Sequence, residues 1–217
     1  MKIAFLGDSI TCGYALADKS KKYSTLVSGT LGMEEENYGI TGTLMAKAGL
    51  NRDNDNAFVT RISLIDGADV AVIFGGTNDY FWSDAPIKGE DDSYFSHALQ
   101  TIAAHVKKHR AGKITLFVTP YPHNGIGNFY GAEHWKDSSR HDTDQKNRNG
   151  QILSDYVEAL EDVCLQNELP ILNLHKDFAF DWRVHTLDGC HPNAQGHKLL
   201  AKTIAAKLEE LCALRNP

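Results

Sequence analysis

Short apolar runs rich in β-branched and aromatic residues alternate along the chain with longer segments of helical periodicity. The apolar runs cover residues 2–7, 69–75, 113–119 and 170–174, and a weaker one lies near 35–39. Strands that alternate with helices are the sequence pattern of a parallel sheet covered by helices. The pattern therefore predicts an α/β fold.

Three segments between and after these runs place apolar residues on one helical face. The stripes consist of Phe95, Leu99, Ile102 and Val106, then Ile152, Tyr156, Leu160 and Val163, and finally Leu200, Ile204, Leu208 and Leu211. This spacing predicts amphipathic helices that pack on the sheet. We expect a cap from residues 91–93 before the first helix and from Asn193 before the last. A further helix is expected over 57–65.

The composition is that of an ordinary globular protein. The 217 residues are 42% hydrophobic and 9% aromatic, which is enough to bury a sizeable core. We find no internal repeat, low-complexity linker or composition break, so we expect a single domain over residues 1–217.

The charge balance narrows the classes of partner. With 22 Lys and Arg against 28 Asp and Glu, the formal net charge is −6. Such a balance gives no general attraction to nucleic acid, and the dense basic cluster at 107–113 is interpreted as a solvated helix end.

The chain carries no targeting or membrane signal that we recognise. No apolar run approaches the roughly 20 residues of a membrane span, and residues 3–7 are too short for a signal-peptide core. The four cysteines, Cys12, Cys164, Cys190 and Cys212, have no metal-type or disulfide-rich spacing. We therefore expect a cytoplasmic protein with reduced thiols.

Residues 120–147 lack a sustained helix or strand period. They contain two prolines, three glycines, the histidines His123, His134 and His141, and the aromatic residues Tyr121, Phe129, Tyr130 and Trp135. Loops this long in compact domains usually bind ligands or cover a site when they are ordered. We expect an active-site loop inserted in the domain.

Three polar segments lie where chemistry is expected in an open parallel sheet. Residues 7–11 and 75–79 follow predicted strands, and residues 188–193 precede the last helix. Because ligands bind at the carboxyl ends of parallel strands, we expect these segments to meet.

The side chains of these segments supply the parts of an acyl-transfer site. A serine hydroxyl such as that of Ser9 becomes a nucleophile when a histidine accepts its proton and a carboxylate orients that histidine. Asp188 and His191 provide such a pair, three residues apart. The amide of Asn78 could stabilise the oxyanion that forms.

Together the segments resemble the sequence blocks of the SGNH, or GDSL, hydrolases, a family of esterases and lipase-like acylhydrolases. Gly-Asp-Ser-Ile-Thr at 7–11 resembles the first block, Asn-Tyr-Gly-Ile-Thr-Gly at 37–42 the second, Gly-Gly-Thr-Asn-Asp at 75–79 the third and Asp-Gly-Cys-His-Pro-Asn at 188–193 the fifth. The blocks occur in the family's order over nearly the whole chain. The resemblance implies a flavodoxin-like three-layer α/β/α sandwich with a five-stranded parallel sheet.

The resemblance also implies a catalytic triad. Ser9 would be the nucleophile, His191 the general base and then acid, and Asp188 the residue that orients His191. No metal or other cofactor takes part in this scheme.

An oxyanion hole is implied as well. Its donors would be the backbone N–H groups of Ser9 and Gly42 and the side-chain amide of Asn78, with Gly39 as the alternative to Gly42. Asp8 and Asp79 receive no catalytic role.

The same residues have plainer interpretations. Ser9 could be a helix N-cap, and Asp188 with His191 could form a structural turn. Cys12 and Cys190 could approach one another and are more simply small buried hydrophobic residues.

Aromatic residues beside the predicted site suggest a substrate surface. Tyr80, Phe81, Trp82 and Tyr121 could stack on a sugar or line an acyl slot, and packing of their own loops explains them equally well.

We expect a serine esterase that cleaves carboxylic esters of small molecules, with short acyl groups such as acetyl on a carbohydrate or other polar molecule. The alternative within the family is a lysophospholipase or an acyl-CoA thioesterase. A more remote alternative is a carbohydrate-binding protein without catalytic activity.

Overall fold

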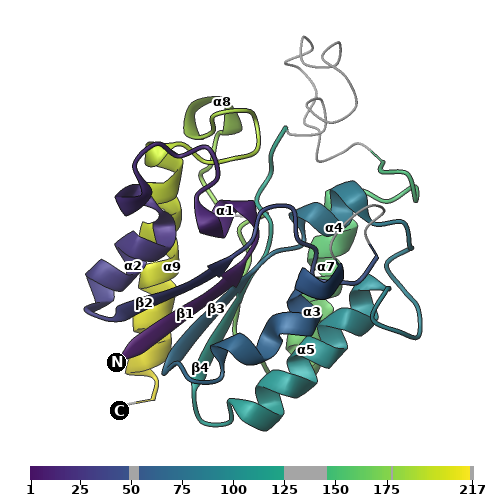
Figure 1. The fold of residues 1–217 in the computed structure, drawn as a ribbon, viewed down its shortest axis with the longest axis horizontal. Coiled ribbons are helices and arrows are strands. Elements are labelled where there is room, and N and C mark those ends of the chain that lie inside the picture. Colours follow the sequence, from purple (N-terminus) through teal and green to yellow (C-terminus); the bar gives the residue numbers. More distant parts are fainter. Residues whose placement is uncertain (49–53, 125–145, 177, 216–217) are drawn as a thin grey trace.

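The centre of the molecule is a parallel β-sheet (Figure 1). The computed structural model describes residues 1–48, 54–124, 146–176 and 178–215. Within these residues the strand order is β2-β1-β3-β4-β5. The strands are β1 (Lys2–Gly7), β2 (Glu34–Gly39), β3 (Val70–Phe74), β4 (Ile114–Val118) and β5 (Ile171–Leu172). This order is that of flavodoxin-like folds, so the predicted fold class is confirmed.

Helices cover both faces of the sheet, with α2 and α9 on one face and α3, α5 and α7 on the other (Figure 1). The helices are α1 (Ser9–Cys12), α2 (Tyr23–Leu31), α3 (Phe58–Arg61), α4 (Thr77–Trp82), α5 (Phe95–His109), α7 (Leu153–Gln166), α8 (Trp182–His185) and α9 (Ala194–Ala213). Short 3₁₀ turns occur at Lys19–Lys21, Asn54–Asn56 and Ile62–Ile65.

Alternate residues of the central strand β1 pack into two separate apolar clusters. Ile3 and Phe5 belong to the cluster under α2 and α9, whereas Ala4 and Leu6 belong to the cluster under α3, α5 and α7. Both faces of the strand are therefore buried, which explains why it is an unbroken apolar run in the sequence.

The register of the sheet brings three strand ends level with one another. Gly7 at the end of β1 pairs with Gly39 of β2 on one side and with Phe74 of β3 on the other. Chain segments that leave these strands therefore start side by side, at the edge where α1 and α4 begin.

The N-cap residues of the helices agree only in part with those expected from the sequence. The Asn193 side chain accepts hydrogen bonds from the N–H groups of Gln195 and Gly196, as predicted for the cap of α9. The cap predicted from residues 91–93 is wrong, because α5 starts later, after Tyr94, without a side-chain cap. The helix expected over 57–65 is α3 followed by the 3₁₀ turn Ile62–Ile65.

The basic cluster at the end of α5 is solvated only in part. Lys107, Lys108 and His109 are exposed, as expected. Arg110 is buried, and its guanidinium donates to the Thr115 hydroxyl at 2.8 Å and to the carbonyl of Ala68 at 3.0 Å. This arginine therefore ties the end of α5 to the loop before β3 and to the start of β4.

No helix among the described residues has the length and apolar character required to cross a lipid bilayer.

Candidate active site

The turn between β1 and α1 presents Ser9. Gly7 ends the strand, and a Cβ there would lie 1.8 Å from the Thr11 hydroxyl, so the close turn needs glycine. The helix cap is Asp8, whose Oδ1 accepts the N–H of Ile10 at 2.9 Å. The N-cap interpretation of Ser9 is therefore wrong, and its hydroxyl is available to another partner.

That partner is His191. The Ser9 Oγ lies 3.0 Å from His191 Nε2, and His191 Nδ1 lies 2.7 Å from Asp188 Oδ2. Both separations are hydrogen-bond distances. Ser9 and His191 are only 7% and 9% exposed. The structure thus joins residues from opposite ends of the chain in a serine–histidine–aspartate chain.

A tight local turn holds the acid and the histidine together. Asp188 Oδ1 accepts the N–H groups of Cys190 at 3.0 Å and His191 at 2.7 Å. Gly189 adopts φ +87°, and a Cβ there would lie 2.3 Å from the carbonyl oxygen of Asn124. The structural-turn interpretation is therefore compatible with the catalytic one, because one carboxylate makes the turn and also faces the imidazole.

The Asp188 carboxyl is held in its ionised form. Burial raises its pKa, but hydrogen bonds from the ring and N–H of His191 and from the N–H of Cys190 outweigh that effect, so the net shift is downward. An ionised carboxylate at Nδ1 keeps a proton on that nitrogen and leaves Nε2 as the acceptor for the Ser9 hydroxyl.

Asn78 lies in the first turn of α4, beside the same strand edge. Its Nδ2 donates to the Thr43 carbonyl at 3.0 Å and lies 3.4 Å from Asp8 Oδ2. The second bond is long, so one N–H of the amide is held only weakly. The amide expected in the oxyanion hole is therefore buried at the edge where Ser9 lies.

Gly42 and Gly39 differ in what their N–H groups do. Gly42 adopts φ +76°, and within the described part of the chain its N–H donates no hydrogen bond. The N–H of Gly39 donates to the side-chain oxygen of Asn37 at 2.9 Å, and a Cβ at Gly39 would lie 2.3 Å from the Cys12 nitrogen. This geometry favours Gly42 over Gly39 as an oxyanion donor.

Asp79, next to Asn78, holds the backbone segment that contains Gly42. Its carboxylate accepts the N–H of Met45 at 2.9 and 3.1 Å and the N–H of Ala46 at 3.0 Å. Complete burial raises its pKa to about 7, although these bonds oppose the shift. Two adjacent residues of α4 thus fix the chain around residues 42–46.

Arg61 holds this segment from the other side. Its Nη2 donates to the Gly7 carbonyl at 2.7 Å and to the Thr43 hydroxyl at 3.0 Å, and its Nη1 donates to the Tyr38 carbonyl. Burial lowers the pKa of Arg61 to about 10 and raises that of Asp8 to about 6. The ends of β1 and β2 and the segment at Thr43 are therefore linked through one buried guanidinium.

The sequence blocks assign no catalytic role to Asp8 or Asp79, and they do not include Arg61. The available signal for Arg61 is its position as the single charged residue in the 57–65 segment. A buried charge of this kind is unusual unless it is hydrogen-bonded.

The aromatic residues expected at the substrate surface are placed differently. Tyr80, Phe81 and Tyr121 are buried, and Trp82 is half-buried against the apolar cluster of α5 and α7. The Tyr121 hydroxyl donates to the Cys190 carbonyl at 2.7 Å, so it braces the turn that carries His191. None of the three buried rings offers an exposed face, and a substrate role for these four residues stays a prediction.

The 120–147 loop is described only at its two ends. His123 is buried with its ring centroid 5.0 Å from that of Phe81, and burial lowers its pKa to about 3, so the ring is neutral. The other residues expected to line the site from this loop lie outside the described residues: Phe129, Tyr130, His134, Trp135 and His141.

The cysteines near the site are free thiols. Cys12 Sγ lies 3.3 Å from the Ser9 carbonyl oxygen and 3.2 Å from the Thr41 hydroxyl. Cys190 is buried, and burial raises its pKa well above the ordinary value. The interpretation as a small buried hydrophobic residue fits Cys190.

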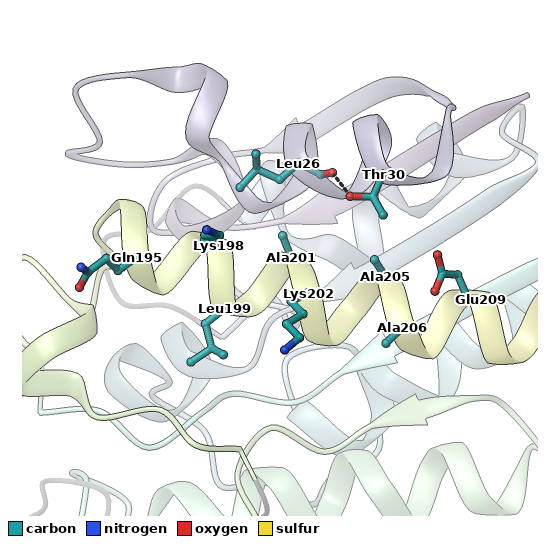
Figure 2. Close-up of a pocket in the computed structure, with 10 residues that line it drawn as sticks. All are labelled: Leu26, Thr30, Gln195, Lys198, Leu199, Ala201, Lys202, Ala205, Ala206 and Glu209. Carbon is teal, nitrogen blue, oxygen red and sulfur yellow. Dashed lines mark hydrogen bonds between the residues drawn. The ribbon is translucent and has the colours of Figure 1, made fainter.

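A separate groove of about 690 Å³ lies between α2 and α9, away from these groups (Figure 2). Its walls are mainly apolar, and the Thr30 hydroxyl donates to the Leu26 carbonyl at 2.9 Å. It is lined by Leu26, Thr30, Gln195, Lys198, Leu199, Ala201, Lys202, Ala205, Ala206 and Glu209. The catalytic groups are absent from this lining, and no set of three or more metal-ligating side chains occurs within the described residues.

Known proteins similar to this chain include carbohydrate esterases. An acetylxylan esterase of Xylanibacter ruminicola is 27% identical over 227 residues, an alignment that covers 96% of this chain. The chain corresponds to only 43% of that relative's length.

Solved structures agree on the fold. A protein from Lactobacillus plantarum has a TM-score of 0.78 at 25% identity, with 96% of each chain covered. A two-domain esterase active on acetylated mannans has a TM-score of 0.60 at 18% identity, covering 97% of this chain and 49% of that one. The model of the GDSL-like lipase/acylhydrolase family matches residues 5–199. The chain is therefore a member of the GDSL-like lipase/acylhydrolase family.

Proposed function

We propose that this chain is a serine esterase that hydrolyses carboxylic esters through an acyl-enzyme. The observation that carries the proposal is the hydrogen-bonded chain from Ser9 Oγ through His191 to Asp188, with distances of 3.0 and 2.7 Å. Membership of the family supports the same reaction.

In the first half of the reaction, Ser9 Oγ forms a bond to the ester carbonyl carbon while His191 Nε2 takes the hydroxyl proton. The carbonyl oxygen becomes an oxyanion, which accepts hydrogen bonds from the N–H groups of Ser9 and Gly42 and from the Asn78 amide. To donate to the oxyanion, the Asn78 amide nitrogen, which lies 3.4 Å from Asp8 Oδ2, turns one N–H from that carboxylate toward the substrate.

Collapse of this intermediate breaks the bond to the alcohol oxygen, and His191 donates its proton to that oxygen. A water molecule then gives a proton to His191 Nε2 and attacks the acyl carbon. Release of the acid returns the proton to Ser9 Oγ. Asp188 stays ionised throughout and stabilises the imidazolium in both halves.

For the substrate we propose a short acyl group, such as acetyl, on a carbohydrate or another small polar alcohol. Its support is the similarity to an acetylxylan esterase of Xylanibacter ruminicola. A lysophospholipase or acyl-CoA thioesterase is the alternative within the family. Turnover of matched acetyl and decanoyl esters separates the two, because a clear preference for decanoyl contradicts the short-acyl proposal.

The test of the reaction is covalent labelling combined with turnover. We expect a fluorophosphonate to modify the wild-type protein at Ser9, and Ser9→Ala to abolish labelling and lower p-nitrophenyl acetate turnover by roughly 10⁴–10⁶-fold. Ser154→Ala on α7 serves as the matched serine control and should retain both properties. Full turnover by Ser9→Ala together with an unlabelled wild type would contradict the proposal. A wild type that is neither labelled nor active would favour a non-catalytic carbohydrate-binding protein.

A further inference from the structure

The loop that follows α1 holds one aromatic residue in an unusual backbone setting. Gly13 and Ala15 adopt φ +70° and +59°, so the residues on both sides of Tyr14 are left-handed. This region is strained for alanine, and strained residues cluster at functional sites. The N–H of Tyr14 donates to the Ser9 carbonyl at 2.8 Å, and that of Gly13 donates to the Ile10 carbonyl at 3.2 Å. The position of Tyr14 is thus fixed relative to the serine.

The Tyr14 ring packs against the imidazole of His191. The two ring centroids are 4.7 Å apart, with an interplanar angle of 51°. Tyr14 is nevertheless 47% exposed. Single exposed apolar residues are common on proteins, but this one combines exposure with direct contact to the histidine of the triad. Four tyrosines that belong to the apolar core are buried instead: Tyr23, Tyr80, Tyr121 and Tyr156.

The chemistry places the two parts of an ester on different sides of Ser9. The acyl oxygen must face the donors at Asn78 and Gly42, whereas the alcohol oxygen must come within hydrogen-bond distance of His191 Nε2 to receive its proton. A group that contacts the His191 ring and is open to solvent is therefore beside the alcohol part of the substrate.

We infer that Tyr14 is a specificity-determining residue that binds the alcohol part of the ester by stacking. A half-exposed aromatic face suits the flat apolar face of a pyranose ring, and it gives much less contact to a small acyclic alcohol. The inference rests on the proposed esterase function and adds to it the class of alcohol that the site selects.

A role limited to packing predicts a different result. If Tyr14 only held the His191 ring in place, its loss would lower the turnover of every ester by the same factor. If it binds the alcohol, its loss changes the selectivity between alcohols. The ratio of kcat/KM for two esters that share an acyl group therefore distinguishes the two roles.

The experiment uses an acetylated methyl pyranoside and ethyl acetate with the wild type, Tyr14→Ala and Tyr14→Phe. We expect Tyr14→Ala to lower the pyranoside to ethyl acetate ratio of kcat/KM about 5–10-fold, mainly through KM for the pyranoside, the range expected for one aromatic contact. Tyr14→Phe keeps the ring and should keep the ratio. Leu165→Ala, at an exposed apolar position on α7, is the control for unspecific effects.

An unchanged ratio in Tyr14→Ala overturns the inference, whether turnover of both esters falls together or stays the same. The inference is also overturned if Tyr14→Phe lowers the ratio of kcat/KM as much as Tyr14→Ala does, because Tyr14→Phe still has the aromatic face for stacking. Failure of the esterase function itself has another signature, a wild type that cleaves neither ester and is not labelled by a fluorophosphonate.

Discussion

The two halves of the site, on either side of Ser9, are built in different ways. The acid and the histidine come from one six-residue stretch, in which Asp188 forms both the turn and the contact with His191. The oxyanion side is assembled from separate chain segments that include β1, α3, α4 and residues 42–46. One half is therefore determined locally, and the other depends on long-range contacts.

The electrostatic environments of the two halves also differ. Hydrogen bonds at the triad lower the pKa of Asp188 in spite of its burial. On the oxyanion side, burial dominates and raises the pKa of Asp8 to about 6 and that of Asp79 to about 7. Carboxyl groups whose environments shift their pKa values in opposite directions serve different purposes. In the proposed reaction Asp188 provides the charge that stabilises the base, whereas Asp8 and Asp79 mainly hold backbone N–H groups.

The largest effect in this comparison is expected from Asp188→Asn. The side-chain oxygen can still accept the N–H groups of Cys190 and His191, so the turn should remain. The amide NH₂ then faces His191 Nδ1 and favours the wrong tautomer, so kcat should fall about 10⁴-fold. Steady-state assays with p-nitrophenyl acetate measure kcat, and circular dichroism shows whether the fold is retained.

Asp162→Asn, at an exposed position on α7, is the matched control and should keep the wild-type rate. If kcat of Asp188→Asn stayed above one tenth of the wild-type value, the action of His191 as a base would not depend on the Asp188 carboxylate.

A smaller effect is expected on the oxyanion side from Asn78→Ala. Loss of one oxyanion donor lowers kcat by roughly 10²–10³-fold, with less effect on KM. Asn167→Ala is the control, because Asn167 Nδ2 also donates to a backbone carbonyl, that of Val163 at 2.9 Å, but lies at the end of α7. Equal kinetic losses in both variants would mean that the Asn78 amide is only structural.

These differences explain what could be predicted from the sequence. The strands, the three long helices and the residues of the proposed triad follow from local patterns and from short blocks in a known order. Asp79 and Arg61 act on backbone groups far away in the sequence, such as the N–H of Met45, 34 positions before Asp79. No spacing rule identifies such partners, because a backbone N–H has no sequence signature.

The burial of the aromatic residues that follow the third sequence block has a related reason. Tyr80 and Phe81 follow Asn78 and Asp79 directly, but α4 turns their rings into the apolar cluster under α5 and α7. Tyr14, which is exposed beside His191, lies in a loop whose direction depends on two left-handed residues. Sequence proximity to a block therefore did not predict which aromatic residue faces the solvent.

The smallest expected effect is on the free energy of unfolding. Its dependence on pH distinguishes the Asp79 carboxyl of the oxyanion side from the Asp188 carboxyl of the other half. Because the pKa of Asp79 is raised to about 7, its contribution to folding is complete below pH 4 and is lost as the pH rises toward 7. Asp79→Asn cannot ionise and keeps one acceptor for the N–H groups of Met45 and Ala46. Its free energy of unfolding relative to the wild type should therefore improve between pH 5 and pH 8.

Urea denaturation of both proteins at the two pH values measures this change, and each pKa unit corresponds to about 1.4 kcal/mol. Asp8 is present in both proteins, and because its charge also raises the pKa of Asp79, the difference includes the repulsion between these two carboxylates. Asp162→Asn, with its exposed carboxyl, should show no such change. The opposite result would be that Asp79→Asn becomes less stable relative to the wild type as the pH rises. In that case the hydrogen bonds from the N–H groups of residues 45 and 46 would lower the pKa of Asp79 by more than burial raises it. Asp79 would then be held as an ion like Asp188, and the electrostatic contrast between the two halves would disappear.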